Sequence, residues 1–80
     1  MKLYILSYAS FSCSDYQIFS DTIGVYTTKE DAISALRMNL TSDIMGGDDE
    51  NDWEVSEMDA EYNNDYSDEY KMYHIKEVEA

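Results

Sequence analysis

The chain has 80 residues, which corresponds to a single domain spanning residues 1–80 with room for only a small hydrophobic core. Eighteen acidic side chains against five basic ones give a formal net charge of −13 at pH 7, which opposes binding to nucleic acids or anionic membranes, while eight tyrosines argue against the disorder common in acidic chains. The single cysteine excludes an internal disulfide framework, and no stretch resembles a secretory signal or reaches the roughly 18 apolar residues of a membrane span, so we expect a cytoplasmic protein.

Two strands are predicted at the start of the chain. Residues 2–8 (KLYILSY) carry apolar side chains on both faces, as in a central strand that a helix covers on one side. The serine-rich residues 9–20 are expected to form a loop. Residues 22–27 (TIGVYT) are predicted to form a second, short strand.

One helix is predicted to begin at residue 29 and to end between residues 40 and 45. Thr28 is a suitable N-cap, and Asp31 stands at the third helical position, as in a variant of the capping box. The pair Gly46–Gly47 ends the helical pattern in the manner of a C-cap. The spacing of the apolar residues is typical of one helix face, which comprises Ala32, Ile33, Ala35, Leu36, Leu40 and Ile44.

Two further strands are predicted after the helix. Residues 53–58 (WEVSEM) are predicted to form a strand in which Trp53 and Val55 share one face, and Trp53 is expected in the core. Residues 59–69 are expected to form a polar, acidic connection, and residues 70–78 (YKMYHIKEV) the last strand. The predicted fold is therefore α+β, a three- or four-stranded, mainly antiparallel sheet with one helix packed on one face, in the order β-(β)-α-β-β. The other sheet face is left to solvent or to a partner.

The residue types that carry catalysis are sparse. His74, the only histidine, is interpreted as a partly exposed structural residue of the last strand, and Cys13 lacks a neighbouring base that would activate its thiol. Residues 48–54 (DDENDWE) place oxygen ligands at alternate positions, as calcium loops do, although Trp53 stands where such a loop needs glycine. We expect no enzyme, no metal and no cofactor, with a calcium site as a minor alternative.

Negative charge is concentrated in residues 43–69, which we call the acidic segment. It contains twelve acidic residues and no lysine, arginine or histidine. In extended strands, alternate carboxylates would recur every ~6.6–6.8 Å, a spacing comparable with phosphates along one nucleic acid strand. Tyr62, Tyr66 and Tyr70 interleave with the acids, and tyrosine rings can receive arginine by cation–π stacking. This pattern predicts a surface that attracts basic clefts, with a field that weakens as salt rises.

The first half of the chain resembles small uncharacterised phage and bacterial domains of the β-α-β-β type. The resemblance is carried by GVYTTKE (residues 24–30), which matches a G-x-Y-[ST]-[ST]-x-E turn, and by the alanines Ala32 and Ala35 of the helix that follows. It implies the fold, since these residues form a tight turn and a helix start, and it implies no activity.

In size, acidity and single-domain organisation the chain also resembles the small acidic DNA-mimic inhibitors of phages and mobile elements, especially those of the anti-CRISPR and antirestriction type. This resemblance transfers no residue by position. It implies a basic nucleic-acid-binding protein as partner, such as a Cas effector nuclease, and action in the cytoplasm of the bacterial host cell. The predicted partner-binding residues come from the charge pattern of the acidic segment and comprise Asp48, Asp49, Glu50, Asp52, Glu54, Glu57, Asp59, Glu61, Tyr62, Asp65, Tyr66, Asp68 and Glu69.

The alternative hypothesis is a small phage or bacterial protein–protein interaction module. Such a module would bind its partner through the open sheet face, and its acidic surface would serve only solubility. The two hypotheses differ in salt dependence, because apolar binding survives moderate salt and charge mimicry does not.

Overall fold

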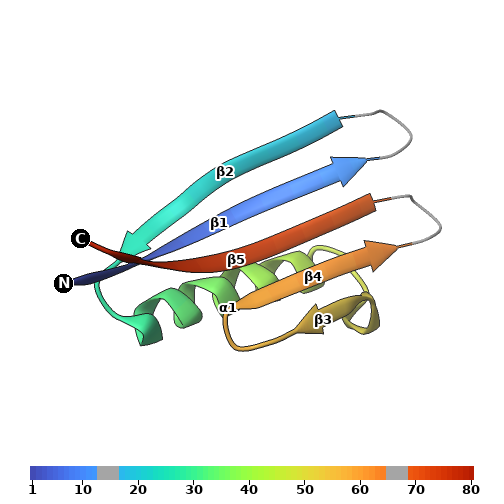
Figure 1. Ribbon diagram of the computed structural model, residues 1–80. Coiled ribbons are helices and arrows are strands. Elements are labelled where there is room, and N and C mark those ends of the chain that lie inside the picture. The colour runs from blue at the N-terminus through green and yellow to red at the C-terminus, as the bar shows by residue number, and fades with distance from the viewer. Residues whose placement is uncertain (13–16, 65–68) are drawn as a thin grey trace.

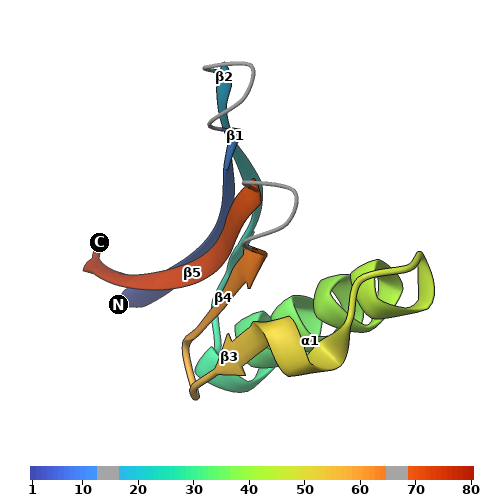
Figure 2. The same cartoon turned by 90° about the vertical axis from the view of Figure 1, so that its right-hand side faces the viewer.

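The computed structural model describes residues 1–12, 17–64 and 69–80. The five strands form one sheet in the order β2-β1-β5-β4-β3, with every neighbouring pair antiparallel (Figure 1). The helix α1 covers one face of this sheet, as the second view shows (Figure 2). The elements are β1 (Lys2–Ser12), β2 (Gln17–Tyr26), α1 (Lys29–Met45), the short 3-10 helix η1 (Glu50–Asp52), β3 (Trp53–Val55), β4 (Asp59–Asn64) and β5 (Glu69–Glu79).

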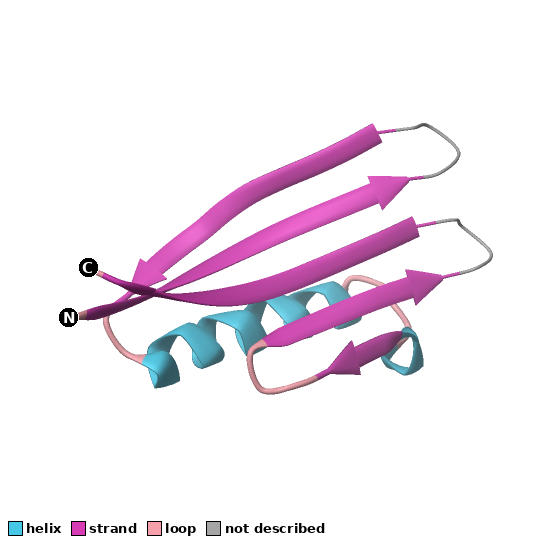
Figure 3. Ribbon diagram, in the orientation of Figure 1, coloured by secondary structure: helices cyan, strands magenta, loops and turns pink. Residues whose placement is uncertain are grey.

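The predicted α+β class with one helix on an antiparallel sheet is confirmed, and the sheet has five strands in place of three or four (Figure 3). Residues 9–12 and 17–20 belong to strands instead of the predicted loop. Ala9 pairs with Ser20 and Phe11 pairs with Ile18, so both segments are held in the β1–β2 hairpin, and along β1 the apolar Ala9 and Phe11 alternate with serines. Cross-strand pairing with this period of two outweighs the local turn preference of serine.

The additional strand β4 replaces part of the predicted acidic connection. Ala60 is 0% and Tyr62 4% exposed on the face toward the helix, while Glu61 between them is exposed on the other face. The chain therefore satisfies the period of a strand with acids on one side only. β3 ends at Val55, short of the predicted residue 58, because the chain turns there to enter β4.

The helix begins and ends as its capping residues predict. The Asp31 N–H donates to Thr28 Oγ1 at 3.2 Å, and the Gly46 N–H donates to the Ser42 carbonyl at 2.9 Å. α1 leaves the edge strand β2 and packs across β1, β2 and β5 before the chain reaches β3 at the opposite edge. Neither α1 nor η1, the two helices of the described residues, has the length and apolar character that crossing a membrane requires.

The core lies between α1 and the covered sheet face. The ring of Trp53 packs at a centroid distance of 5.2 Å from Tyr62 and 5.8 Å from Tyr73, which in turn lies 5.0 Å from Tyr8. These aromatic pairs join β3, β4, β5 and β1 and confirm Trp53 as a core residue. The buried side chains are Leu6, Ala32, Leu36, Leu40, Trp53, Ala60, Tyr62, Tyr73 and Ile75.

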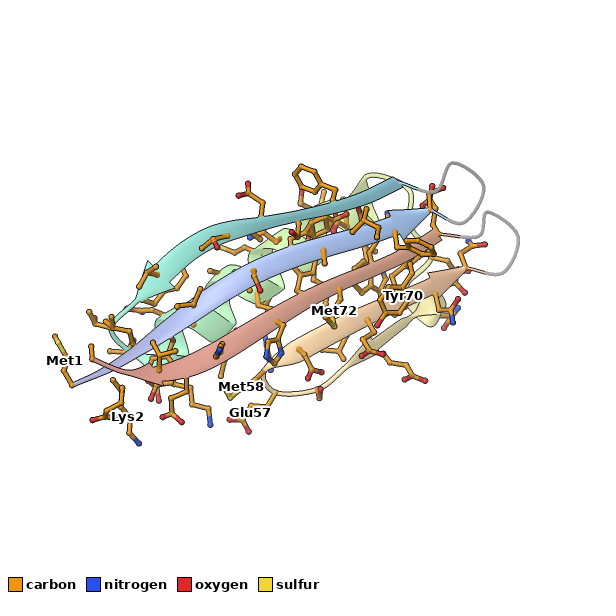
Figure 4. The ribbon with its side chains drawn as sticks, turned by 45° about the horizontal axis from the view of Figure 1, so that its top comes forward. Met1, Lys2, Glu57, Met58, Tyr70 and Met72 are labelled. Atoms are coloured by element: carbon orange, nitrogen blue, oxygen red, sulfur yellow. The ribbon has the colours of Figure 1, made fainter. Side chains whose placement is uncertain are left out.

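The opposite sheet face is not covered by any described element. Figure 4 shows this open face, on which the labelled side chains of Tyr70 and Met72 lie. Phe11 of β1 pairs with Tyr70, and Ala9 pairs with Met72, so this part of the face is apolar. The exposed His74 shares the face and stands opposite Asp59 of β4 in the register.

Candidate acidic interface

Three of the predicted interface acids are ion-paired with lysine. Lys71 of β5 lies 2.9 Å from Asp48 and 3.8 Å from Glu69. Lys29, at the start of α1, pairs with Glu57 in the turn between β3 and β4. These three carboxylates are partly neutralised within the chain, so they are weaker candidates for binding a basic partner.

The contacts of Lys71 show that Asp48 serves the fold. Burial acts to lower the pKa of Lys71, but the hydrogen bond and charge of Asp48, together with the charge of Glu69, outweigh it and raise this pKa. The Lys71 ammonium also lies 4.7 Å from the centre of the Tyr62 ring, within cation–π range. Asp48 therefore ties the turn after α1 to β5.

The predicted row of alternating carboxylates does not form between residues 48 and 52, because residues 48–49 are irregular and residues 50–52 form η1 in place of a strand. Asp49 is the N-cap of η1, and its carboxylate accepts a hydrogen bond from the Asn51 N–H at 2.9 Å. Asp52 accepts one from the Asn64 side chain at 3.3 Å. The Asp49 contact is a local bond between a side chain and the backbone, of the kind that aspartate makes readily and that competes with strand formation.

The remaining acids gather where η1, β3 and β4 meet. Glu54 and Glu61 stand directly opposite each other in the β3–β4 register, which places their Cβ atoms about 5 Å apart. Like charges in this position destabilise a sheet. Six carboxylates in this region form no ion pair with a lysine or arginine of the described residues. We call them the acidic edge: Asp49, Glu50, Asp52, Glu54, Asp59 and Glu61.

Two shallow hollows lie along the acidic edge and share Glu54 and Glu61. One has a volume of about 260 Å³ and is lined by Asn51, Asp52, Glu54, Glu61, Asn63 and Tyr70. The other has a volume of about 330 Å³ and is lined by Glu54, Val55, Ser56, Asp59 and Glu61. Burial, followed by the charge of Glu61 and a hydrogen bond with it, raises the pKa of Tyr70. Paired carboxylates beside a tyrosine ring are suited to a guanidinium or ammonium group.

The other predicted interface residues lie elsewhere. Tyr62 is a core residue whose hydroxyl accepts a hydrogen bond from Asn64 at 2.9 Å, so its ring is not available to a partner. Asp65, Tyr66 and Asp68 lie outside the described residues. Asn63, absent from the prediction, lines the first hollow, and its place two residues after Glu61 on β4 would have indicated this once the strand was known.

The described part of the chain contains no cluster of side chains of the kind that a metal site requires. Residues 1–12, 17–64 and 69–80 contain no group of three or more histidine, cysteine, aspartate or glutamate side chains placed to hold a metal ion. Two positions of the possible calcium loop are engaged in the fold, Asp48 with Lys71 and Asp52 with Asn64. Cys13 lies outside the described residues.

The acidic edge is chemically a surface of negative charge and hydrogen-bond acceptors. It can receive arginine and lysine side chains through charge-assisted hydrogen bonds, and it repels phosphate. Comparisons with protein-family models, with curated proteins and with solved structures find no match for this chain.

Proposed function

We propose that the protein is an inhibitor, encoded by a phage or mobile element, that blocks the nucleic-acid-binding groove of a host defence nuclease such as a CRISPR-Cas effector. It would act in the cytoplasm of the bacterial host cell, and its acidic edge would occupy the positions of phosphates. The observation that carries the proposal is the gathering around η1, β3 and β4 of carboxylates that form no ion pair with a lysine or arginine of the described residues, while Lys2, Lys29 and Lys71 pair with other acids.

The spacing of the acidic edge supports phosphate mimicry. Asp59 and Glu61 are two residues apart on β4, which corresponds to about 6.6–6.8 Å. This distance is close to the axial rise of two nucleotides, at about 3.4 Å each in one strand of a duplex. Glu54 adds a third carboxylate on the neighbouring strand, opposite Glu61. Arginine side chains placed to contact every second phosphate of one strand therefore meet oxygen acceptors at a comparable pitch.

The repulsion within the acidic edge also favours a basic partner. Glu54 and Glu61 oppose each other without a lysine or arginine among the described residues to neutralise them. A guanidinium bound between them would remove this repulsion, so relief of an unfavourable interaction adds to the binding free energy. The same charges protect β3 from pairing with foreign strands, so an experiment has to separate binding from solubility.

Two variants with the same change in net charge make this separation. The triple variant Glu50→Gln, Glu54→Gln and Glu61→Gln removes charge from the acidic edge. The control, Asp21→Asn, Glu30→Gln and Glu79→Gln, removes the same charge from β2, the start of α1 and the end of β5. Circular dichroism should show that both variants keep the fold.

The assay is inhibition of DNA cleavage by purified Cas9-type and other phage-defence nucleases, with dissociation constants measured at about 50 and 300 mM salt. At roughly 0.5–1 kcal/mol for each lost charge pair, the edge variant should bind about 10- to 100-fold more weakly, and the control should match the wild type. Salt or competing DNA should release the wild type. Equal inhibition by both triple variants, or a wild type that inhibits none of the nucleases, would overturn the proposal. Salt-resistant capture would favour the alternative, an interaction module that uses the open sheet face.

A further inference from the structure

The second edge of the sheet, β2, has the opposite chemistry to the acidic edge. This strand has ten residues, and Asp21 is its only charged residue. Ile18 is 77% and Val25 56% exposed. A long edge strand with exposed apolar side chains and unpaired backbone groups is a template for another strand. We call Ile18, Phe19, Ile23 and Val25 the apolar edge.

The apolar edge offers contacts on both faces of the sheet. Ile18 pairs with Phe11, and Val25 pairs with Ile5, along the open face. Phe19 and Ile23 lie on the other side and line a hollow of about 240 Å³ next to α1. A strand added to β2 would therefore be flanked by apolar side chains above and below its backbone. The irregular register near Ile23 interrupts the edge at one point and leaves β2 paired with β1 on both sides of it.

We propose that β2 pairs with β2 of a second copy of this chain, so that two antiparallel sheets join into one continuous ten-stranded sheet. Antiparallel pairing of a strand with itself obeys two-fold symmetry, in which each copy contributes the same residues. Such an interface is self-complementary here because each apolar edge meets another apolar edge.

The distribution of charge selects a second copy as the occupant. The strand order places β3 at the far side of each sheet, so the two acidic edges of the dimer are nine strand spacings apart, roughly 43 Å along the sheet. This is about five Debye lengths at physiological salt, and the repulsion between the acidic edges is screened. Pairing through β3 would instead bring the two acidic edges together. A basic partner, which the acidic edge attracts, meets only Asp21 on β2.

The dimer is independent of the proposed inhibitor function, and it has the opposite salt dependence. Each chain carries a net charge of −13, so salt lowers the repulsion between two copies and should strengthen their association. Binding of a basic groove to the acidic edge should weaken over the same range. A failure of one proposal therefore leaves the other intact.

Sedimentation equilibrium from about 5 to 500 μM protein tests the proposal, since interfaces of this kind range widely in affinity. The wild type should form dimers, and the variant Ile18→Lys with Val25→Lys should stay monomeric. The control, Met38→Lys with Met45→Lys, adds the same charge at two exposed apolar residues of α1 and should dimerise like the wild type. A monomeric wild type over the whole range would overturn the proposal, as would dissociation by the control pair alone.

Hydrogen exchange on the wild type gives a second measurement that does not depend on a variant folding. Amides of β2 should become more protected as the protein concentration rises, because pairing engages the N–H groups that point away from β1. Amides of β3 should not change. Dimers without added protection in β2 would place the interface elsewhere and refute the pairing.

Discussion

Replacing Lys71 with methionine tests whether one half-buried ion pair holds the acidic segment to the sheet. Lys71 and Asp48 are 19% and 18% exposed at their side chains, and the ammonium lies 3.1 and 2.9 Å from the two carboxylate oxygens. Methionine keeps the length and apolar contact of the side chain while removing its charge. Asp48 would then remain half-buried without its counter-ion, so we expect the variant to be less stable.

The size of the effect follows from the exposure of the pair. At 2.9 Å the gross attraction is about 6 kcal/mol with an effective dielectric constant of about 20, and desolvation of both groups offsets most of it. Exposed pairs contribute up to about 1 kcal/mol, and breaking fully buried pairs costs about 3–5 kcal/mol. For this pair we expect a loss of about 2 kcal/mol. A domain of this size has a free energy of unfolding of about 4–12 kcal/mol, so the melting temperature should fall by about 10 °C.

Urea unfolding, followed by the fluorescence of the single, buried tryptophan Trp53, measures the loss. The matched control is Lys29→Met, which removes the same charge from a pair whose side chains are 40% and 64% exposed, and which should cost much less because solvent screens an exposed pair. Adding Asp48→Asn to Lys71→Met should recover part of the loss, because the uncompensated charge is gone. Equal costs for the two lysine variants, or no recovery in the double variant, would show that the reasoning is wrong.

Two further variants test predictions that depend on pH. Tyr73→Phe removes the hydroxyl that donates to Asp43 at 2.5 Å and should lower the free energy of unfolding by about 1–2 kcal/mol at pH 7 in urea titrations. Burial, the hydrogen bond to Asp43 and the charge of Asp43 raise the pKa of Tyr73 above its ordinary value of 10.0. The stabilisation by the hydroxyl is therefore complete below pH 10 and is lost at higher pH. A difference in stability between the wild type and Tyr73→Phe that stays the same in alkali would contradict this. The hydrogen bond to Lys29 and the charge of Lys29 lower the pKa of Glu57 below its ordinary value of 4.5, so the stabilisation is present above pH 4.5 and lost as pH falls through the lowered pKa. The melting temperatures of the wild type and Glu57→Gln should therefore differ at pH 7 and converge near pH ~3, whereas a constant difference would exclude this ion pair as the cause.

The parts of the fold that were predictable from the sequence are those with local signals. The cap formed by Thr28 and Asp31 and the apolar spacing of the helix depend on residues within a few turns of one another, and both are confirmed. β4 was missed because its acids obscure the alternation of Ala60 and Tyr62. These two side chains become core residues only when β5 and β3 lie beside them, and that pairing is set by contacts distant in the sequence.

The negative charge of the candidate site and the segment that carries it were predictable from the sequence, but the individual residues were not. The charge of residues 43–69 indicated an acidic surface, yet the number of free acids depends on lysines far along the chain. Lys71 is 23 residues from Asp48 and neutralises it. Lys29, at the start of α1, pairs with Glu57 in the turn between β3 and β4. Tyr62 is a core residue because its ring packs against Trp53. A run of like charge therefore sets an upper limit on the number of acids that an interface can use. The ion pairs formed in the tertiary structure decide which of these acids remain available to a partner.

The strand order places the acidic β3 at one edge of the sheet and the nearly uncharged β2 at the other. Short length and like charge protect β3 against strand pairing, and the same charge makes it attractive to a basic groove. β2 is longer and nearly uncharged, so it lacks this protection and is the edge at which another strand can add. Because one edge acts through charge and the other through apolar contact and backbone pairing, salt should shift their occupancies in opposite directions. If both the self-association and the nuclease binding of one preparation weakened as salt rose, self-association would also depend on charge attraction, and the assignment of β2 as the apolar docking edge would be wrong.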